Sequence, residues 1–168
     1  MLIEAVRLTL FPAMMAFAAS SDLLTMTIAN RVSLLLIGGF AALAMLSGLS
    51  GADVLSHVGA AAAVLAVAFV CFSCGWIGGG DAKLAAATAL WLGFGNLFSY
   101  LVYASLLGGA LTLFIVQFRT VPLPRVLAGR DWAERLHRQG AGVPYGVALA
   151  AAALLVYPQT VWMTAVGL

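Results

Sequence analysis

Asp22 and Asp81 are the two acidic residues whose positions best suit chemistry. Asp22 follows the first long apolar segment and Asp81 precedes the fourth, so we expect both carboxylates at the same end of these segments. Two carboxylates held close together cannot both ionise cheaply, so they share a proton. One member can then act as a base while the other acts as an acid. Such a pair suits the attack of water on a peptide carbonyl.

Three glycines, Gly78–Gly80, stand directly before Asp81. Residues without a Cβ allow another backbone to approach closely, so this loop suits an extended substrate beside the carboxylate. A second interpretation stays open, in which Asp22 is a helix-boundary residue and Asp81 is an N-cap. The glycines would then form a turn and nothing more.

The other four acidic residues have simpler explanations. Glu4 and Asp53 are expected at the opposite end of the apolar segments, where Asp53 suits the N-cap of the third segment. Asp131 and Glu134 each precede an arginine by four residues, a spacing that favours ion pairs along a short helix. Elimination leaves Asp22 and Asp81 as the candidates for catalysis.

The composition predicts an integral membrane protein. The chain has 168 residues, of which 64% are hydrophobic and 8% are charged. A soluble domain carries about a quarter charged residues, so the polar surface here is too small to cover a globule. The net charge of +2 is too small to indicate nucleic acid as a partner.

Apolar segments of about 20 residues predict about six transmembrane helices in a compact all-α bundle. We expect a single transmembrane domain over residues 1–168, with Pro12 and Pro158 bending their helices rather than ending them. The predicted spans are Leu2 to Ser21, Val32 to Leu49, Val54 to Trp76, a short helix before a break at Gly93–Asn96, a helix from that break to about Phe118, and a helix from about Val143 to the C-terminus.

Basic residues predict the orientation. Seven of the eight lie in the loops 20–31, 76–83 and 119–142, and only Arg7 lies on the other side. The positive-inside rule makes these three loops cytoplasmic and places both termini outside. Loop 119–142 contains either a short membrane-surface helix that contacts anionic lipid or a plain solvated connection. We expect the first segment to be a retained span rather than a cleaved signal peptide.

Cys71 and Cys74 form a C-x-x-C pair inside an apolar segment. A structural zinc site needs four ligands, and His57 and His137 are expected in separate loops. We therefore predict that both cysteines are small packing residues and that the protein holds no metal or cofactor. Gly108 and Gly109 are predicted to allow close helix packing.

Three segments resemble the prepilin peptidases, which are G-x-G-D aspartyl proteases. "GGGD" at Gly78–Asp81 matches the G-x-G-D motif. "SDLLTMTIANRV" resembles the first active-site segment, with Ile28 and Asn30 at the expected spacing after the aspartate. "GVPYGVALAAAAL" is similar to the family's last helix, with Pro144 and Gly146 at its start. The resemblance spans nearly the whole chain in the family's order.

The resemblance is to the short peptidases of tight-adherence (Flp-type) pilus systems. It implies removal of the prepilin leader at the cytoplasmic face of a bacterial inner membrane, just before the substrate's hydrophobic helix. It also implies that Asp22 and Asp81 are catalytic and that Gly78 and Gly80 shape the site. Ala29 stands where the family has proline, and the chain lacks the segment associated with N-methylation, so methyltransferase activity is not expected.

Several questions stay open at this point. Lys83 could bind a lipid phosphate, orient an acidic residue of the substrate or lower the pKa of an aspartate. The same alternatives are open for Arg31, although topology alone is sufficient to explain it. Alternatives for the whole chain are an archaeal-type preflagellin peptidase and a membrane subunit that relays protons or cations without catalysis. The sequence names neither the substrate prepilin nor the oligomeric state.

Overall fold

The computed structural model describes residues 2–164, and within that range the protein is helical without strands. The predicted all-α class is therefore confirmed. The elements are α1 (Leu2–Thr25), α2 (Asn30–Leu46), α3 (Gly51–Ser73), α4 (Gly79–Phe118), α5 (Asp131–His137), α6 (Tyr145–Val156), the 3₁₀ helix η1 (Tyr157–Gln159) and α7 (Val161–Thr164).

Three of these helices are long and apolar enough to cross a membrane: Ile3–Thr25, Gly51–Ser73 and Gly79–Phe118. Two shorter apolar helices, Asn30–Leu46 and Tyr145–Gln159, pack beside them. Lengths of this kind indicate a membrane protein. The count of six spans stays a prediction.

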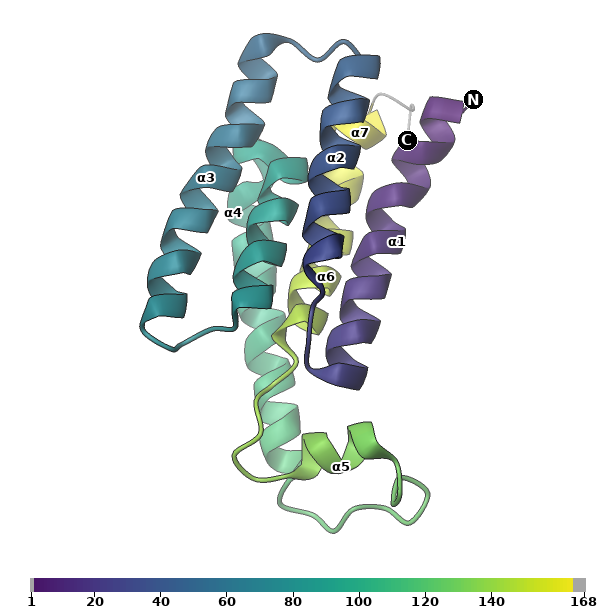
Figure 1. The fold of residues 1–168 in the computed structure, drawn as a ribbon, viewed down its shortest axis with the longest axis vertical. Coiled ribbons are helices and arrows are strands. Elements are labelled where there is room, and N and C mark those ends of the chain that lie inside the picture. Colours follow the sequence, from purple (N-terminus) through teal and green to yellow (C-terminus); the bar gives the residue numbers. More distant parts are fainter. Residues whose placement is uncertain (1, 165–168) are drawn as a thin grey trace.

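Helix α4 reverses direction at the predicted glycine break. Gly93 has φ of 65° and ψ of 176°, which lie outside the helical range. A residue with a Cβ would be strained in this conformation, whereas glycine adopts it readily. In Figure 1 the first part of α4 leads away from the α5 end and the second part returns to it. The break therefore brings both ends of α4 to the same side of the molecule.

His57 supports this break from the neighbouring helix. Its Nδ1 lies 2.7 Å from the carbonyl oxygen of Leu90. In an unbroken helix this carbonyl would accept from the backbone N–H four residues later, beyond the break at Gly93. The ring is buried in α3 and lies near Phe40 and Trp162. The expectation that His57 and His137 lie in loops was wrong, because both belong to helices.

Gly93→Ala should destabilise the fold. A Cβ at Gly93 would lie 3.1 Å from the His57 ring, and φ is positive there. We expect a loss of about 1–3 kcal/mol, because φ of 65° with ψ of 176° is a conformation that essentially only glycine adopts. Gly95→Ala is the matched control, because a Cβ there meets nothing within 4 Å. Thermal unfolding of both variants in detergent measures the difference, and equal midpoints would contradict the assignment.

The core is an aromatic cluster where α1, α2, α4 and the C-terminal helices meet. Trp91 is fully buried and donates through Nε1 to the carbonyl of Leu36 at 2.9 Å. Trp162 in turn donates to the carbonyl of Trp91 at 2.8 Å. Phe11 stacks on Tyr157 with ring centroids 4.5 Å apart. These contacts fix the first half of α4 against α2 and α7, and they fix η1 against α1.

Two predictions about helix ends were wrong. Pro158 ends its helix instead of bending it, because α6 stops at Val156 and the chain continues as a 3₁₀ turn. Proline lacks the N–H that would continue the α-helical ladder. By contrast, α1 runs through Pro12. Asp53 is not an N-cap either, since Ser50 caps α3 by accepting from the Asp53 N–H at 3.2 Å.

Candidate active site

Asp22 and Asp81 line one pocket of about 370 Å³ at the α5 end of the bundle. Asp22 lies in the last turns of α1 and Asp81 in the first turn of α4. The carboxylates are close enough for their charges to interact. The pocket is lined by Asp22, Met26, Gly78, Asp81, Arg135, Ala141, Gly142 and Val143. The two residues selected by their position in the sequence therefore share a site in the fold.

Asp22 is held by the start of α6. It is 5% exposed, and its Oδ2 accepts a hydrogen bond from the Gly146 N–H at 2.7 Å. The first amides of a helix lack partners within the helix, and Pro144 at the N-cap offers no side-chain cap. Asp22 therefore caps α6 from another helix, which fixes the position of its carboxylate.

Gly146 is a glycine because Asp22 and Ile28 lie against it. A Cβ at this position would lie 2.8 Å from Asp22 Oδ2 and 2.7 Å from Ile28 Cδ1. Ile28 reaches this place because the chain turns sharply after α1, where Met26 adopts φ of 56°. The loop between α1 and α2 thus forms one wall beside the aspartates.

The glycines before Asp81 have separate uses. Gly78 is the N-cap of α4, and a Cβ there would lie 3.0 Å from Asp81 Oδ2. A Cβ on Gly80 would lie 3.2 Å from Ile28 Cβ and 3.5 Å from the Ile28 backbone. Gly80 therefore allows α4 to approach the α1–α2 loop. Asp81 is not an N-cap, because Gly78 occupies that position.

Lys83 and Asn30 lie apart from this pocket. The Lys83 Nζ donates to Asn30 Oδ1 at 2.9 Å, and both residues line a different cavity. Two residues of α-helix correspond to about 200° of rotation, so Lys83 leaves α4 on the side opposite Asp81. Of the predicted site residues, Asp22, Asp81 and Gly78 line the pocket, whereas Gly80, Pro144 and Gly146 shape its walls.

Arg135 is a site residue that the sequence interpretation missed. It lines the pocket and donates through Nη1 to the carbonyl of Leu24 at 2.8 Å, which ties α5 to the end of α1. The predicted ion pairs of Asp131 with Arg135 and of Glu134 with Arg138 do not form among residues 2–164. Glu134 Oε1 instead accepts from the Gly129 N–H at 2.9 Å. The short helix itself is present as α5.

Arg119 fixes the segment that leads into α6. Its Nε donates to the Leu136 carbonyl at 2.8 Å, and its Nη2 donates to the carbonyls of Ala141 and Gly142 at 2.9 and 2.8 Å. Ala141 and Gly142 line the aspartate pocket. Arg119 therefore connects the end of α4 to a wall of the site.

Arg119→Lys should lower activity while the charge is kept. A single ammonium cannot reproduce three donations from a planar guanidinium, and each hydrogen bond to a charged group is worth about 1.5–3 kcal/mol. We expect roughly a tenfold loss of turnover from displacement of the pocket wall. Arg125→Lys is the control, because Arg125 is exposed. Rates for both purified variants test this, and equal rates would contradict the role of Arg119.

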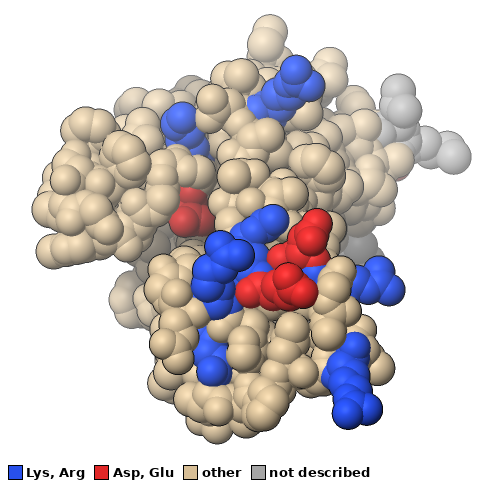
Figure 2. Space-filling view, turned by 60° about the horizontal axis from the view of Figure 1, so that its bottom comes forward, with Lys and Arg blue, Asp and Glu red and all other residues tan. Residues whose placement is uncertain are grey.

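Basic side chains gather at this end of the molecule. Figure 2 looks toward the α5 end, where Lys and Arg outnumber acidic residues on the visible surface.

Cys71 and Cys74 are free cysteines in the last turn of α3 and at its C-cap. Among residues 2–164, no three His, Cys, Asp or Glu side chains form a group that could hold a metal ion. The ionisable residues that line the aspartate pocket are Asp22, Asp81 and Arg135.

Comparison with known families identifies the chain. The model of the type IV leader peptidase family matches residues 9–113. The chain belongs to this family of peptidases. The matched range includes Asp22, Asp81 and the glycines between 78 and 80, whereas Gly146 lies beyond it. Neither the curated proteins nor the solved structures contain a match to this chain.

Proposed function

We propose that this protein is an aspartic endopeptidase that removes the leader from type IV prepilins of the Flp type. The observation that carries the proposal is the shared pocket of Asp22 and Asp81, which come from helices far apart in the sequence. Membership of the type IV leader peptidase family supports the reaction class.

In the proposed mechanism the pair holds one shared proton. The ionised member accepts a proton from water, and the water oxygen attacks the carbonyl carbon of the scissile peptide bond. The protonated member donates to the carbonyl oxygen, so the negative charge of the tetrahedral intermediate is neutralised. Collapse of the intermediate breaks the C–N bond, and the amine takes a proton from the pair. The roles belong to the pair, because two coupled carboxyls titrate together.

The Arg135 guanidinium lines the same pocket and supplies fixed positive charge near the reacting bond. Its attachment to the Leu24 carbonyl leaves other N–H groups of the side chain for substrate carbonyls. A rigid donor in a poorly hydrated site stabilises developing negative charge more strongly than it would in water. Arg135 therefore orients the leader beside the aspartates.

The function is tested by co-expression with a prepilin. The candidate substrate is a small secreted protein with a leader directly followed by a helix of about 20 apolar residues. We expect a faster-migrating product whose N-terminus, determined by sequencing, begins at that helix. The same prepilin expressed without the peptidase is the control. A leader that stays attached beside stably inserted peptidase would contradict the proposal.

The proposed site faces the cytoplasm of a bacterial inner membrane, with both termini outside. A reporter fused after Arg138 should therefore read cytoplasmic, and a reporter fused after Ser50 should read external, because basic loops remain inside. Paired phosphatase and fluorescent-protein fusions at the two positions measure this. If both positions report one compartment, the predicted topology is wrong.

A further inference from the structure

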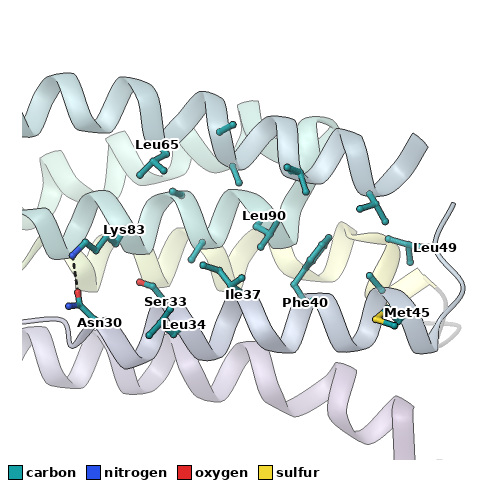
Figure 3. A pocket seen from close by; sticks show the side chains of 18 residues that line it. Asn30, Ser33, Leu34, Ile37, Phe40, Met45, Leu49, Leu65, Lys83 and Leu90 are labelled. Carbon is teal, nitrogen blue, oxygen red and sulfur yellow. Dashed lines mark hydrogen bonds between the residues drawn. The ribbon is translucent and has the colours of Figure 1, made fainter. Parts of the chain in front are cut away.

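A second cavity, much larger than the aspartate pocket, lies between α2 and α3. It has a volume of about 870 Å³, and the first half of α4 forms its floor (Figure 3). Helices α2 and α3 each pack against α4 but hardly against each other, so the groove stays open between them. Along α2 it extends from Asn30 to Met45, which at 1.5 Å per residue is roughly 22 Å. This length suits a long apolar occupant.

The lining favours a helix as the occupant. Small side chains allow two helix backbones to approach closely inside a membrane, and larger apolar residues at the rim pack against the partner's side chains. Leu34, Ile37 and Leu65 line the groove and are 48–66% exposed. The small residues that line the groove are Ala41, Ala44, Ala61, Ala62, Ala86 and Ala87.

The groove has a single charged lining residue in the described part of the chain, and it lies at one end. Lys83 donates to the side chain of Asn30, which is neutral, and the Lys83 ammonium forms no ion pair among residues 2–164 (Figure 3). A cation at the edge of an apolar phase is stabilised by an acidic partner. The groove therefore fits an apolar helix that carries a carboxylate near the end that reaches Lys83.

We propose that this groove binds the apolar helix of the substrate, with Lys83 pairing with an acidic side chain in the first turn of that helix. The inference rests on the proposed function, because a leader peptidase must hold the helix that follows the cleaved bond. It assigns Lys83 and the alanine-lined walls to substrate recognition and leaves hydrolysis to the aspartate pair.

The groove and the aspartate pocket both reach the first turns of α4, the groove through Lys83 and the pocket through Asp81. Lys83 and Asp81 lie on opposite sides of that helix, which is about 10 Å across. The path around half of such a helix is roughly 16 Å. An extended chain covers about 3.3 Å per residue, so about five residues reach from the groove's end to the aspartates. A substrate helix seated in the groove therefore presents to the catalytic pair a peptide bond about five residues before the point that contacts Lys83.

Filling the groove tests the proposal. The double variant Ala41→Phe/Ala62→Phe places two aromatic rings among the lining residues, and Ala42→Phe/Ala63→Phe places the same rings at exposed positions outside the groove. With a full-length prepilin in detergent, the first variant should raise KM by roughly tenfold or more with little change in kcat. Equal KM values for the two variants would overturn the proposal and leave the proposed cleavage activity standing.

A charge swap tests the role of Lys83. Lys83→Glu should lose cleavage of a prepilin whose helix has glutamate in the first turn, and replacement of that glutamate by lysine should restore it. The competing occupant is lipid. Loss of cleavage in Lys83→Ala that depends on the phosphatidylglycerol content of the vesicles, without rescue by the swapped substrate, would overturn the proposal in favour of a lipid site.

Cross-linking identifies the occupant directly. A photoreactive amino acid at Leu65, inside the groove, should attach to the prepilin helix, whereas the same group at Val67 on the other face of α3 should not. Attachment from Leu65 to a second copy of the peptidase, or to lipid alone, would refute the assignment. Failure of the unmodified chain to cleave any prepilin would instead refute the proposed function itself.

Discussion

Asp22→Asn and Asp81→Asn should each abolish leader cleavage while leaving the protein folded in the membrane. Asparagine cannot take the proton from water, so we expect a loss of roughly a thousandfold or more. The fold tolerates the change, because the asparagine oxygen at position 22 can still accept the Gly146 N–H. Cleavage of a co-expressed prepilin, measured with the membrane level of each variant, tests this expectation.

Asp53→Asn and Glu134→Gln are the matched controls. Asp53 pairs with Ser50 at the start of α3, and Glu134 accepts from Gly129 in the basic loop. Neither residue lines the aspartate pocket, and the amides keep an acceptor oxygen for the same partners. Both variants should retain cleavage. Loss of cleavage in the controls, or full cleavage by a stably inserted Asp22→Asn protein, would contradict the assignment.

Gly146→Ala should produce the second largest loss. Its Cβ would lie 2.8 Å from Asp22 Oδ2, so the Asp22 carboxylate or the start of α6 must move. A displacement of about 1 Å in a catalytic group can cost roughly a hundredfold in rate. We expect a fall of that size in kcat for the purified enzyme, with the protein still inserted in the membrane.

Gly109→Ala is the control for this substitution. A Cβ at Gly109 meets nothing within 4 Å, so the variant should keep its activity and gain slightly in helix stability. If Gly146→Ala and Gly109→Ala had equal rates, the contact between Gly146 and Asp22 would have no catalytic importance.

The sequence predicted the features that depend on local pattern and position. The apolar segments predicted helices, and the glycine at 93 predicted a break that the structure places at that residue. The pairing of Asp22 with Asp81 followed from counting alternating spans, because helix ends on one side of a bundle lie close together. Gly108 and Gly109 were both predicted to allow close packing. The Tyr145 ring lies against Gly108, whereas a Cβ at Gly109 would meet nothing within 4 Å, so the prediction was right for Gly108 alone.

Contacts between distant segments could not be predicted in this way. Arg135 donates to the carbonyl of Leu24, which is 111 residues away in the sequence. The positive-inside rule was sufficient to explain the basic loop residues, so the sequence pattern did not indicate a role for Arg135 in the pocket. Among residues 2–164 the expected ion pairs along α5 do not form. Arg135 donates to a carbonyl of α1 instead, and Glu134 accepts from the Gly129 N–H. The separation of Lys83 from Asp81 is an exception, because a spacing of two residues on a helix places two side chains about 200° apart.

The most direct test of the central claim is the residual rate of the double variant Asp22→Asn/Asp81→Asn. Purified variants are compared by mass spectrometry with one prepilin, which allows slow cleavage to be quantified. If the carboxylates act as one pair, the double variant should lose no more than either single variant, because removal of either member disables both. Losses that multiply in the double variant would show two independent contributions and would contradict a shared catalytic site.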